Sequence, residues 1–183
     1  RSFGVSKIFR PMVSKIQKKN ADQSYNEIIK KIKIKQDVVK VNIDGVQFGD
    51  LLYDTYLKLY REPTIDIEDK RFKSMLRDFL CLYYFWKEYF SIHKVSAIIG
   101  VHSSYAYGLP LRVAINKKIP TYALRGTWSC TKLRENVLSA FGNFFEYPEL
   151  FKALDNKIKE KGILEAKKIL ELRVSGISGP KTH

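Results

Sequence analysis

Apolar residues recur at helical spacing over much of the chain, most clearly in three segments. In residues 25–35 the isoleucines predict one face of an amphipathic helix that ends in a lysine-rich turn. Residues 51–60 predict a second helix with Asp50 at its N-cap. Residues from about 70 to 93 predict a long and strongly aromatic third helix, buried along most of one side.

Other segments predict strands. Residues 38–43 alternate and are rich in β-branched side chains, and Asp44-Gly45 follows them as a turn. The short apolar runs 94–100 and 119–124 flank a predicted helix over residues 107–116. A strand, a helix and a second strand in this order favour parallel pairing. We therefore expect an α/β fold with a parallel sheet and additional helical segments.

The C-terminal part again has the helical pattern. Residues 148–161 and 164–173 predict two helices separated by Gly162, and residues 175–183 predict a flexible tail. The length favours a single α/β domain over residues 1–174. Because the sequence starts without a methionine, we also expect it to be a piece of a longer protein.

Charge narrows the possible partners without selecting one. The 183 residues include 33 Lys and Arg against 19 Asp and Glu, a formal net charge of +14, which attracts anions of every kind. Acidic residues concentrate in residues 41–69, between two basic regions. The lysine clusters fit solvated helix faces, although nucleic acid or anionic lipid stays open. Aromatic content excludes intrinsic disorder, and the apolar runs fall far short of the ~20 residues of a membrane span.

The two cysteines do not predict a metal or redox site. Cys81 lies in an aromatic run and Cys130 in a polar loop, and neither belongs to a paired spacing. We therefore expect no metal and no cofactor, and a reducing compartment, the cytoplasm.

Three side chains at the start of the second predicted helix form the first candidate site. Asp50, Tyr53 and Asp54 lie within about one helical turn, where a carboxylate can act as a general base or bind hydroxyl groups. The alternative is that Asp50 only caps the helix while the aromatic residue packs.

The second candidate site follows the predicted strands. Ligands of open α/β sheets gather at the carboxyl ends of parallel strands, where His102 and Arg125 are expected. His102 can transfer a proton near neutral pH, with Ser103, Ser104 and Tyr105 as hydroxyl partners. Arg125 can hold an anionic group by paired hydrogen bonds. The alternatives are a histidine that only fixes its loop and an ordinary surface arginine.

Two long segments resemble a known family. Residues 41–60, VNIDGVQFGDLLYDTYLKLY, and residues 95–124, VSAIIGVHSSYAYGLPLRVAINKKIPTYAL, resemble bacterial capsule and surface-polysaccharide glycosyltransferases of GT-B architecture. Residues 166–177, AKKILELRVSGI, are similar to the region in which such chains lead toward their second half. The resemblance covers most of residues 39–177, although its motifs are less specific than a phosphate-binding loop or a metal-binding motif.

The resemblance implies a Rossmann-like parallel sheet flanked by helices, as the N-terminal, acceptor-side half of a two-domain enzyme. The nucleotide-sugar would be held mainly by a C-terminal domain that is missing here, so the chain alone is expected to be inactive. A growing surface glycan would be the acceptor, at the inner face of an anionic membrane. The expected bases are His102 and then Asp50, and the expected substrate-binding residues are Tyr53, Asp54, Ser103, Ser104, Tyr105 and Arg125.

A noncatalytic basic module is the competing hypothesis. It would bind nucleic acid, or a partner in polysaccharide assembly, through its charge and aromatic residues. Nucleic acid is disfavoured because the aromatic residues 83–86 are consecutive on a predicted core helix and cannot form one stacking platform.

Overall fold

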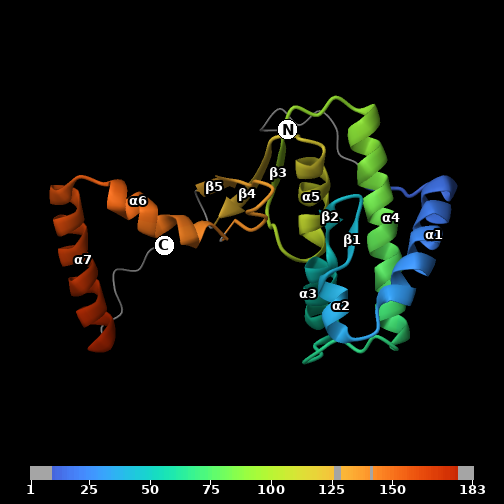
Figure 1. Ribbon diagram of the computed structural model, residues 1–183, viewed down its shortest axis with the longest axis horizontal. Helices are drawn as coiled ribbons and strands as arrows, with labels where there is room; N and C mark the ends of the chain where they lie inside the picture. The colour runs from blue at the N-terminus through green and yellow to red at the C-terminus, as the bar shows by residue number, and fades with distance from the viewer. Residues whose placement is uncertain (1–9, 126–128, 141, 177–183) are drawn as a thin grey trace. The chain divides into compact units, whose positions relative to one another are not determined.

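The computed structural model describes residues 10–125, 129–140 and 142–176 (Figure 1). The chain divides into two compact units, residues 1–142 and residues 143–183, and each is described by itself.

Helices and two small sheets make up the first unit, which confirms the mixed α/β class. In chain order its elements are α1 (Lys15–Lys31), α2 (Lys35–Val39), β1 (Asn42–Ile43), β2 (Val46–Gln47), α3 (Gly49–Tyr60), α4 (Lys70–Ile92), β3 (Ile98–Gly100), the 3-10 helix η1 (Tyr105–Gly108), α5 (Leu109–Asn116), β4 (Thr121–Arg125) and β5 (Ser129–Lys132). Helix α4 occupies almost the predicted range, with the Asp69 side chain capping its start.

Helix α1 begins at Lys15, well before the predicted start at Tyr25. A capping box fixes this start, because Ser14 Oγ accepts the backbone N–H of Gln17 at 3.2 Å and Gln17 Oε1 accepts that of Ser14 at 2.8 Å. The helix packs along α4 (Figure 1), where Gln17 donates from Nε2 to Glu88 at 2.7 Å. Residues 15–24, ahead of the predicted start, therefore belong to the folded unit.

The strand predicted over residues 38–43 is wrong in its first half. Its first two residues belong to the short helix α2, and the Asp37 carboxylate accepts two backbone N–H groups just before that helix, each at 3.0 Å. The second half is correct, since β1 pairs antiparallel with β2 around the predicted turn. Local capping therefore overrides the β preference of the valines.

The turn of this hairpin is anchored to two helices. Asp44 accepts hydrogen bonds from the Tyr83 hydroxyl at 2.7 Å and from Lys87 Nζ at 2.5 Å, both on α4. Asn116 of α5 donates from Nδ2 to the Asp44 carbonyl at 3.2 Å. A hairpin this short is not stable alone, so these contacts hold it in place. The hydrogen bonds from Lys87 and Tyr83 lower the pKa of Asp44.

Helix α3 starts against the preceding helix. Its N-cap is Phe48, so Asp50 lies in the first turn and the prediction of an Asp50 N-cap is wrong. A Cβ on Gly49 would lie 1.9 Å from the Val38 carbonyl oxygen and 2.7 Å from that of Val39. Only glycine permits this approach of two backbones, which sets the position of α3.

A three-stranded sheet lies beyond α5, in the order β3-β4-β5. The parallel pairing of β3 with β4 across α5 was predicted and is confirmed. Strand β5 pairs antiparallel with β4. Among the described residues the sheet is therefore small and mixed, and it does not form the Rossmann-like parallel sheet expected from the family resemblance.

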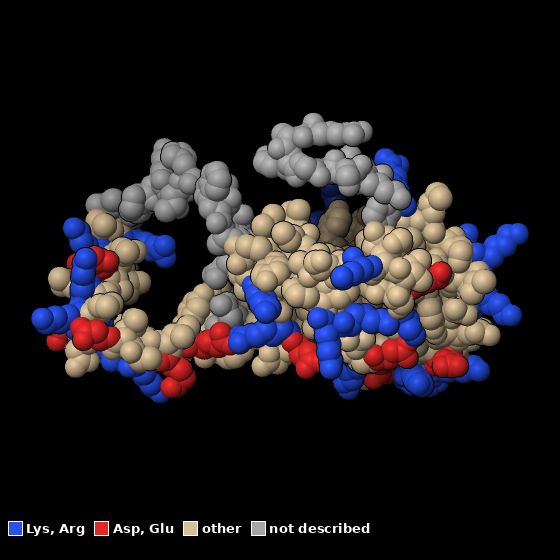
Figure 2. Space-filling view, turned by 90° about the horizontal axis from the view of Figure 1, so that it is seen from above, with Lys and Arg blue, Asp and Glu red and all other residues tan. Residues whose placement is uncertain are grey.

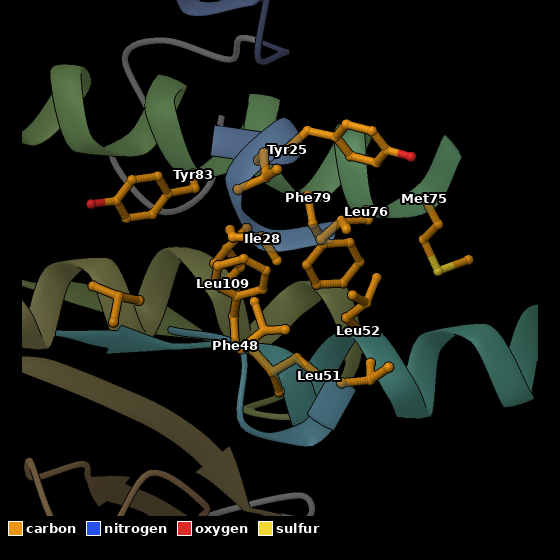
Figure 3. Packing of buried hydrophobic residues seen from close by; sticks show 14 of the residues in the cluster. Tyr25, Ile28, Phe48, Leu51, Leu52, Met75, Leu76, Phe79, Tyr83 and Leu109 are labelled. Atoms are coloured by element: carbon orange, nitrogen blue, oxygen red, sulfur yellow. The ribbon is translucent and has the colours of Figure 1, made fainter. Parts of the chain in front are cut away.

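The main core lies between helices, not beneath this sheet. Figure 3 shows side chains of α4 extending toward those of α3, with Phe48 and Leu109 between them. The Phe48 and Phe79 rings stack with their centroids 6.1 Å apart. Tyr83 is buried in this cluster, which raises its pKa. A smaller cluster beside the sheet contains Leu111, Ala123, Leu133 and Ala140.

The second unit contains α6 (Tyr147–Ala153) and α7 (Asn156–Val174) after the 3-10 helix η2 (Gly142–Glu146). Gly162 lies inside α7, so the predicted break there is wrong. Neither α6 nor α7 buries a side chain. The predicted tail lies outside the described residues beyond residue 176, and the single domain over residues 1–174 remains a prediction. No helix in the described ranges has both the length and the apolar character needed to cross a bilayer.

Gly49→Ala is expected to destabilise the first unit by about 3 kcal/mol or more, because backbone must move to admit the methyl group. Urea denaturation followed by near-ultraviolet circular dichroism measures this loss. Gly162→Ala is the control, since no atom lies within 4 Å of its Cβ position. It should raise helix stability by about 1 kcal/mol. Equal effects of the two substitutions would contradict the close approach at Gly49.

Asp44→Asn is expected to lower the free energy of unfolding at neutral pH by about 1 kcal/mol, a modest value because the carboxylate is half-exposed. The pKa of Asp44 is lower in the folded protein than its ordinary value of 3.8. The stabilising contribution of the carboxylate is therefore complete above pH 3.8, and it is lost as the pH falls through the pKa of the folded protein. The difference between wild type and variant should therefore shrink in denaturation series below pH 3.8. Asp22→Asn serves as the control, because Asp22 is exposed and its carboxylate lies 3.9 Å from Arg77. If the stability difference between wild type and Asp44→Asn grew on acidification, the stabilising role of the Asp44 carboxylate would be refuted.

Candidate functional site

The parallel strands bring two predicted residues to one edge of the sheet. Gly100 of β3 is paired with Ala123 of β4, so His102 and Arg125 each lie two residues beyond a paired position. Both backbones therefore reach the carboxyl edge of the pair, as predicted. The His102 side chain is exposed, and its ring centroid lies 6.3 Å from that of Tyr107.

The serines after His102 have different surroundings. Ser103 is buried and its Oγ accepts the backbone N–H of Ala140 at 3.1 Å, so this hydroxyl holds two loops together. Ser104 is exposed and precedes η1 in extended conformation. Of these two serines, Ser104 is therefore the one with an accessible hydroxyl for a ligand.

The loop that carries His102 is held tightly. A Cβ on Gly108 would lie 2.3 Å from the Ser103 carbonyl oxygen and 3.1 Å from Leu51 Cδ1 of α3. This close approach seats η1 on α3. The first and second predicted sites are therefore neighbours, which the sequence did not show.

A shallow depression lies where the two segments meet. It is lined by Asp54, Leu57 and Lys58 of α3 and by Tyr105 of η1. Lys58 Nζ lies 4.2 Å from the centre of the Tyr105 ring, a cation–π contact. Burial, with a further contribution from the Asp50 carboxylate, raises the pKa of Asp54, and Arg112 partly opposes this. A carboxyl group with a raised pKa is suited to accept a proton.

Asp50 and Tyr53, the other predicted residues of α3, are bound within the fold. Arg112 of α5 donates from Nη1 and Nη2 to the two oxygens of Asp50 at 2.5 and 2.6 Å, and from Nη1 to the Gln47 carbonyl at 2.9 Å. The Tyr53 hydroxyl lies 3.0 Å from Thr64 Oγ1. The paired hydrogen bonds favour a positioning role for Asp50 over proton transfer.

Two residues of the site were not predicted from sequence. Arg112 is the one charged residue in the apolar helix segment LPLRVAIN, and this is a signal that a buried partner must exist. Lys58 lies on the polar side of a predicted amphipathic helix, where a lysine is expected, so the sequence did not mark it as a site residue. Its contact with Tyr105 depends on the seating of η1.

Nothing in the described ranges gathers three or more His, Cys, Asp or Glu side chains that could hold a metal ion. Comparison of the chain with protein-family models, with curated proteins and with solved structures found no match. The resemblance to glycosyltransferases therefore remains a prediction.

Asp50→Ala is expected to lower the free energy of unfolding by about 2–4 kcal/mol, because it leaves a buried guanidinium unpaired. The Arg112 side chain is only 9% exposed and that of Asp50 is 37% exposed. Glu68→Ala is the matched control, since it breaks an exposed pair with Lys73 and should cost under about 1 kcal/mol. Urea denaturation measures both.

The double variant Asp50→Ala with Arg112→Met separates pairing from packing. It should be more stable than Asp50→Ala alone, because the unpaired charge is removed with its partner. A double variant whose losses simply add would show that the ion pair makes no coupled contribution.

Proposed function

We propose that this chain is the acceptor-side part of a glycosyltransferase that extends a bacterial surface glycan. The observation that supports it best is the carboxyl edge of the parallel strands. There His102 and Arg125 share an edge, and η1 brings Tyr105 against α3 beside Asp54. Imidazole, hydroxyl, carboxylate and ammonium groups in one region suit a polyhydroxylated acceptor.

The proposed reaction needs a base. As an acceptor hydroxyl attacks the anomeric carbon of a nucleotide-sugar, its proton must pass to the protein while the phosphate leaves. His102 is the first candidate because its imidazole is exposed at the edge. Asp54, with its raised pKa, is the second, and it replaces Asp50, which Arg112 holds. The sugar would invert its configuration in this mechanism.

Two cations lie in the segments that form this region. Lys58 lines the depression, where its ammonium can offset charge on the departing phosphate, whereas for Arg125 the backbone position at the end of β4 is what supports the predicted anion-binding role. The resemblance assigns most donor contacts to a C-terminal GT-B domain. We therefore propose that residues of this chain bind the acceptor and complete the donor site, with no cofactor besides the nucleotide-sugar substrate.

The charge pattern of the first unit does not favour a nucleic-acid site. On the face seen in Figure 2, Lys and Arg of the first unit are interspersed with Asp and Glu. A nucleic-acid site favours an uninterrupted basic track with exposed aromatic platforms.

A noncatalytic partner in polysaccharide assembly is the second candidate. The second unit favours it, because α6 and α7 bury no side chain and expose large apolar residues such as Leu150, Leu164 and Leu170. Such surfaces mark contacts with other macromolecules. Under this alternative the edge of the sheet would bind no sugar.

Ligand-observed NMR with acidic oligosaccharides, nucleotide-sugars and a short RNA, at low and near-physiological salt, tests the proposal. Oligosaccharide binding should survive salt and weaken about tenfold in His102→Ala, a loss typical of one or two hydrogen bonds. His93→Ala, at the end of α4, is the control and should bind as wild type. RNA binding alone, fading with salt, would instead favour the noncatalytic basic module.

In an enzyme that contains the donor domain, His102→Gln should lower kcat by about 10²-fold or more, as expected for loss of a general base. Asp54→Asn is the second variant and tests the other candidate. Wild-type turnover in both variants would exclude the assigned bases.

A further inference from the structure

A polar cleft lies on the hairpin and shares no residue with the edge of the sheet. Its volume is about 300 Å³, near the lower end for ligand pockets. The hairpin, the second half of α5 and the loop after β5 form its walls. The polar residues of the lining are Asn42, Gln47, Arg112, Asn116 and Glu135.

The hairpin wall of this cleft is held in place by the protein itself. The hairpin turn is held through Asp44, whose carboxylate binds α4 and whose carbonyl binds Asn116. The other end of the hairpin is held by the hydrogen bond from Arg112 to the Gln47 carbonyl. A rigid wall lowers the entropy that a ligand must overcome on binding.

The polar groups around the cleft suit hydroxyls. Asn42, Gln47, Asn116 and Glu135 are exposed. Each carboxamide uses one of its two polar atoms within the protein, namely Asn42 Oδ1, Gln47 Nε2 and Asn116 Nδ2. The other atom of each amide, and the Glu135 carboxylate, have no partner in the described part of the chain. A ligand that both donates and accepts hydrogen bonds satisfies this mixture.

Charge excludes an anion as the preferred occupant, although the whole protein is basic. The guanidinium of Arg112 is neutralised by Asp50, and Glu135 leaves a negative charge at the cleft. Val46, Ile115 and Leu138 add apolar surface against which ring C–H groups can pack.

We propose that this cleft binds one neutral saccharide ring. Its hydroxyls bond to the carboxamides and to Glu135, and its C–H face lies on the apolar residues. The site goes beyond the proposed transferase chemistry, because none of its residues belongs to the edge where transfer would occur. It would hold a sugar unit without reacting with it.

Protein-observed NMR tests this with glucose, galactose and N-acetylglucosamine, each added up to about 50 mM, because single rings bind proteins in the millimolar range. We expect shifts of the side-chain amide signals of Asn42, Gln47 and Asn116. Glu135→Ala should weaken binding about fivefold, the effect of one lost hydrogen bond. Glu135 has no partner in the described ranges, so its replacement should leave the fold intact.

His102→Ala is the matched control, and it should leave the cleft shifts unchanged. The two proposals can then fail independently. Sugar binding in the cleft is followed by the side-chain amide signals, whereas acceptor binding at the edge of the sheet is tested by the His102→Ala variant. The proposal is overturned if none of the three sugars shifts the carboxamide signals. Shifts that Glu135→Ala does not weaken would also overturn it.

Discussion

The paired hydrogen bonds between Arg112 and Asp50 connect the parts of the first unit that carry the proposed sites. Arg112 belongs to α5, the crossover helix between the parallel strands, and Asp50 to α3, which carries Asp54. The same guanidinium binds the Gln47 carbonyl of the hairpin. The edge of the sheet, the depression and the cleft are therefore all connected to the Arg112 side chain. The buried charge is tolerated because a carboxylate and a carbonyl satisfy most of its donors, although Nε has no partner among the described residues.

The proposed sites differ in the kind of backbone that supports them. His102 follows β3 and Arg125 is the last residue of β4, and their positions depend on the register of the two strands and on the seating of η1. The cleft depends on a two-stranded hairpin that would not persist without its anchors. Both arrangements use α5 as a support. A ligand at either site would thus meet side chains on a prearranged backbone, which favours binding.

Sequence patterns predicted the elements whose signal is local. The aromatic repeat of α4 and the strand-helix-strand order around α5 identified both correctly, and the strand ends located His102 and Arg125. The early start of α1 was missed although its capping box stands in the sequence. The partner of Asp50 could not be predicted, because it lies 62 residues away. The contact of Lys58 with Tyr105 likewise depends on tertiary packing.

Helix α7 has a consequence for the dynamics of the chain. Among the described residues this helix of 19 residues buries no side chain, so its own hydrogen bonds and the Asp155 cap are the stabilising contacts observed. Isolated helices of this length are marginal in water, so opening requires little free energy. Its amide protons should exchange with solvent far sooner than those of α4, whose apolar face is buried. We therefore expect a slowly exchanging core in the first unit and a helix α7 that opens more readily.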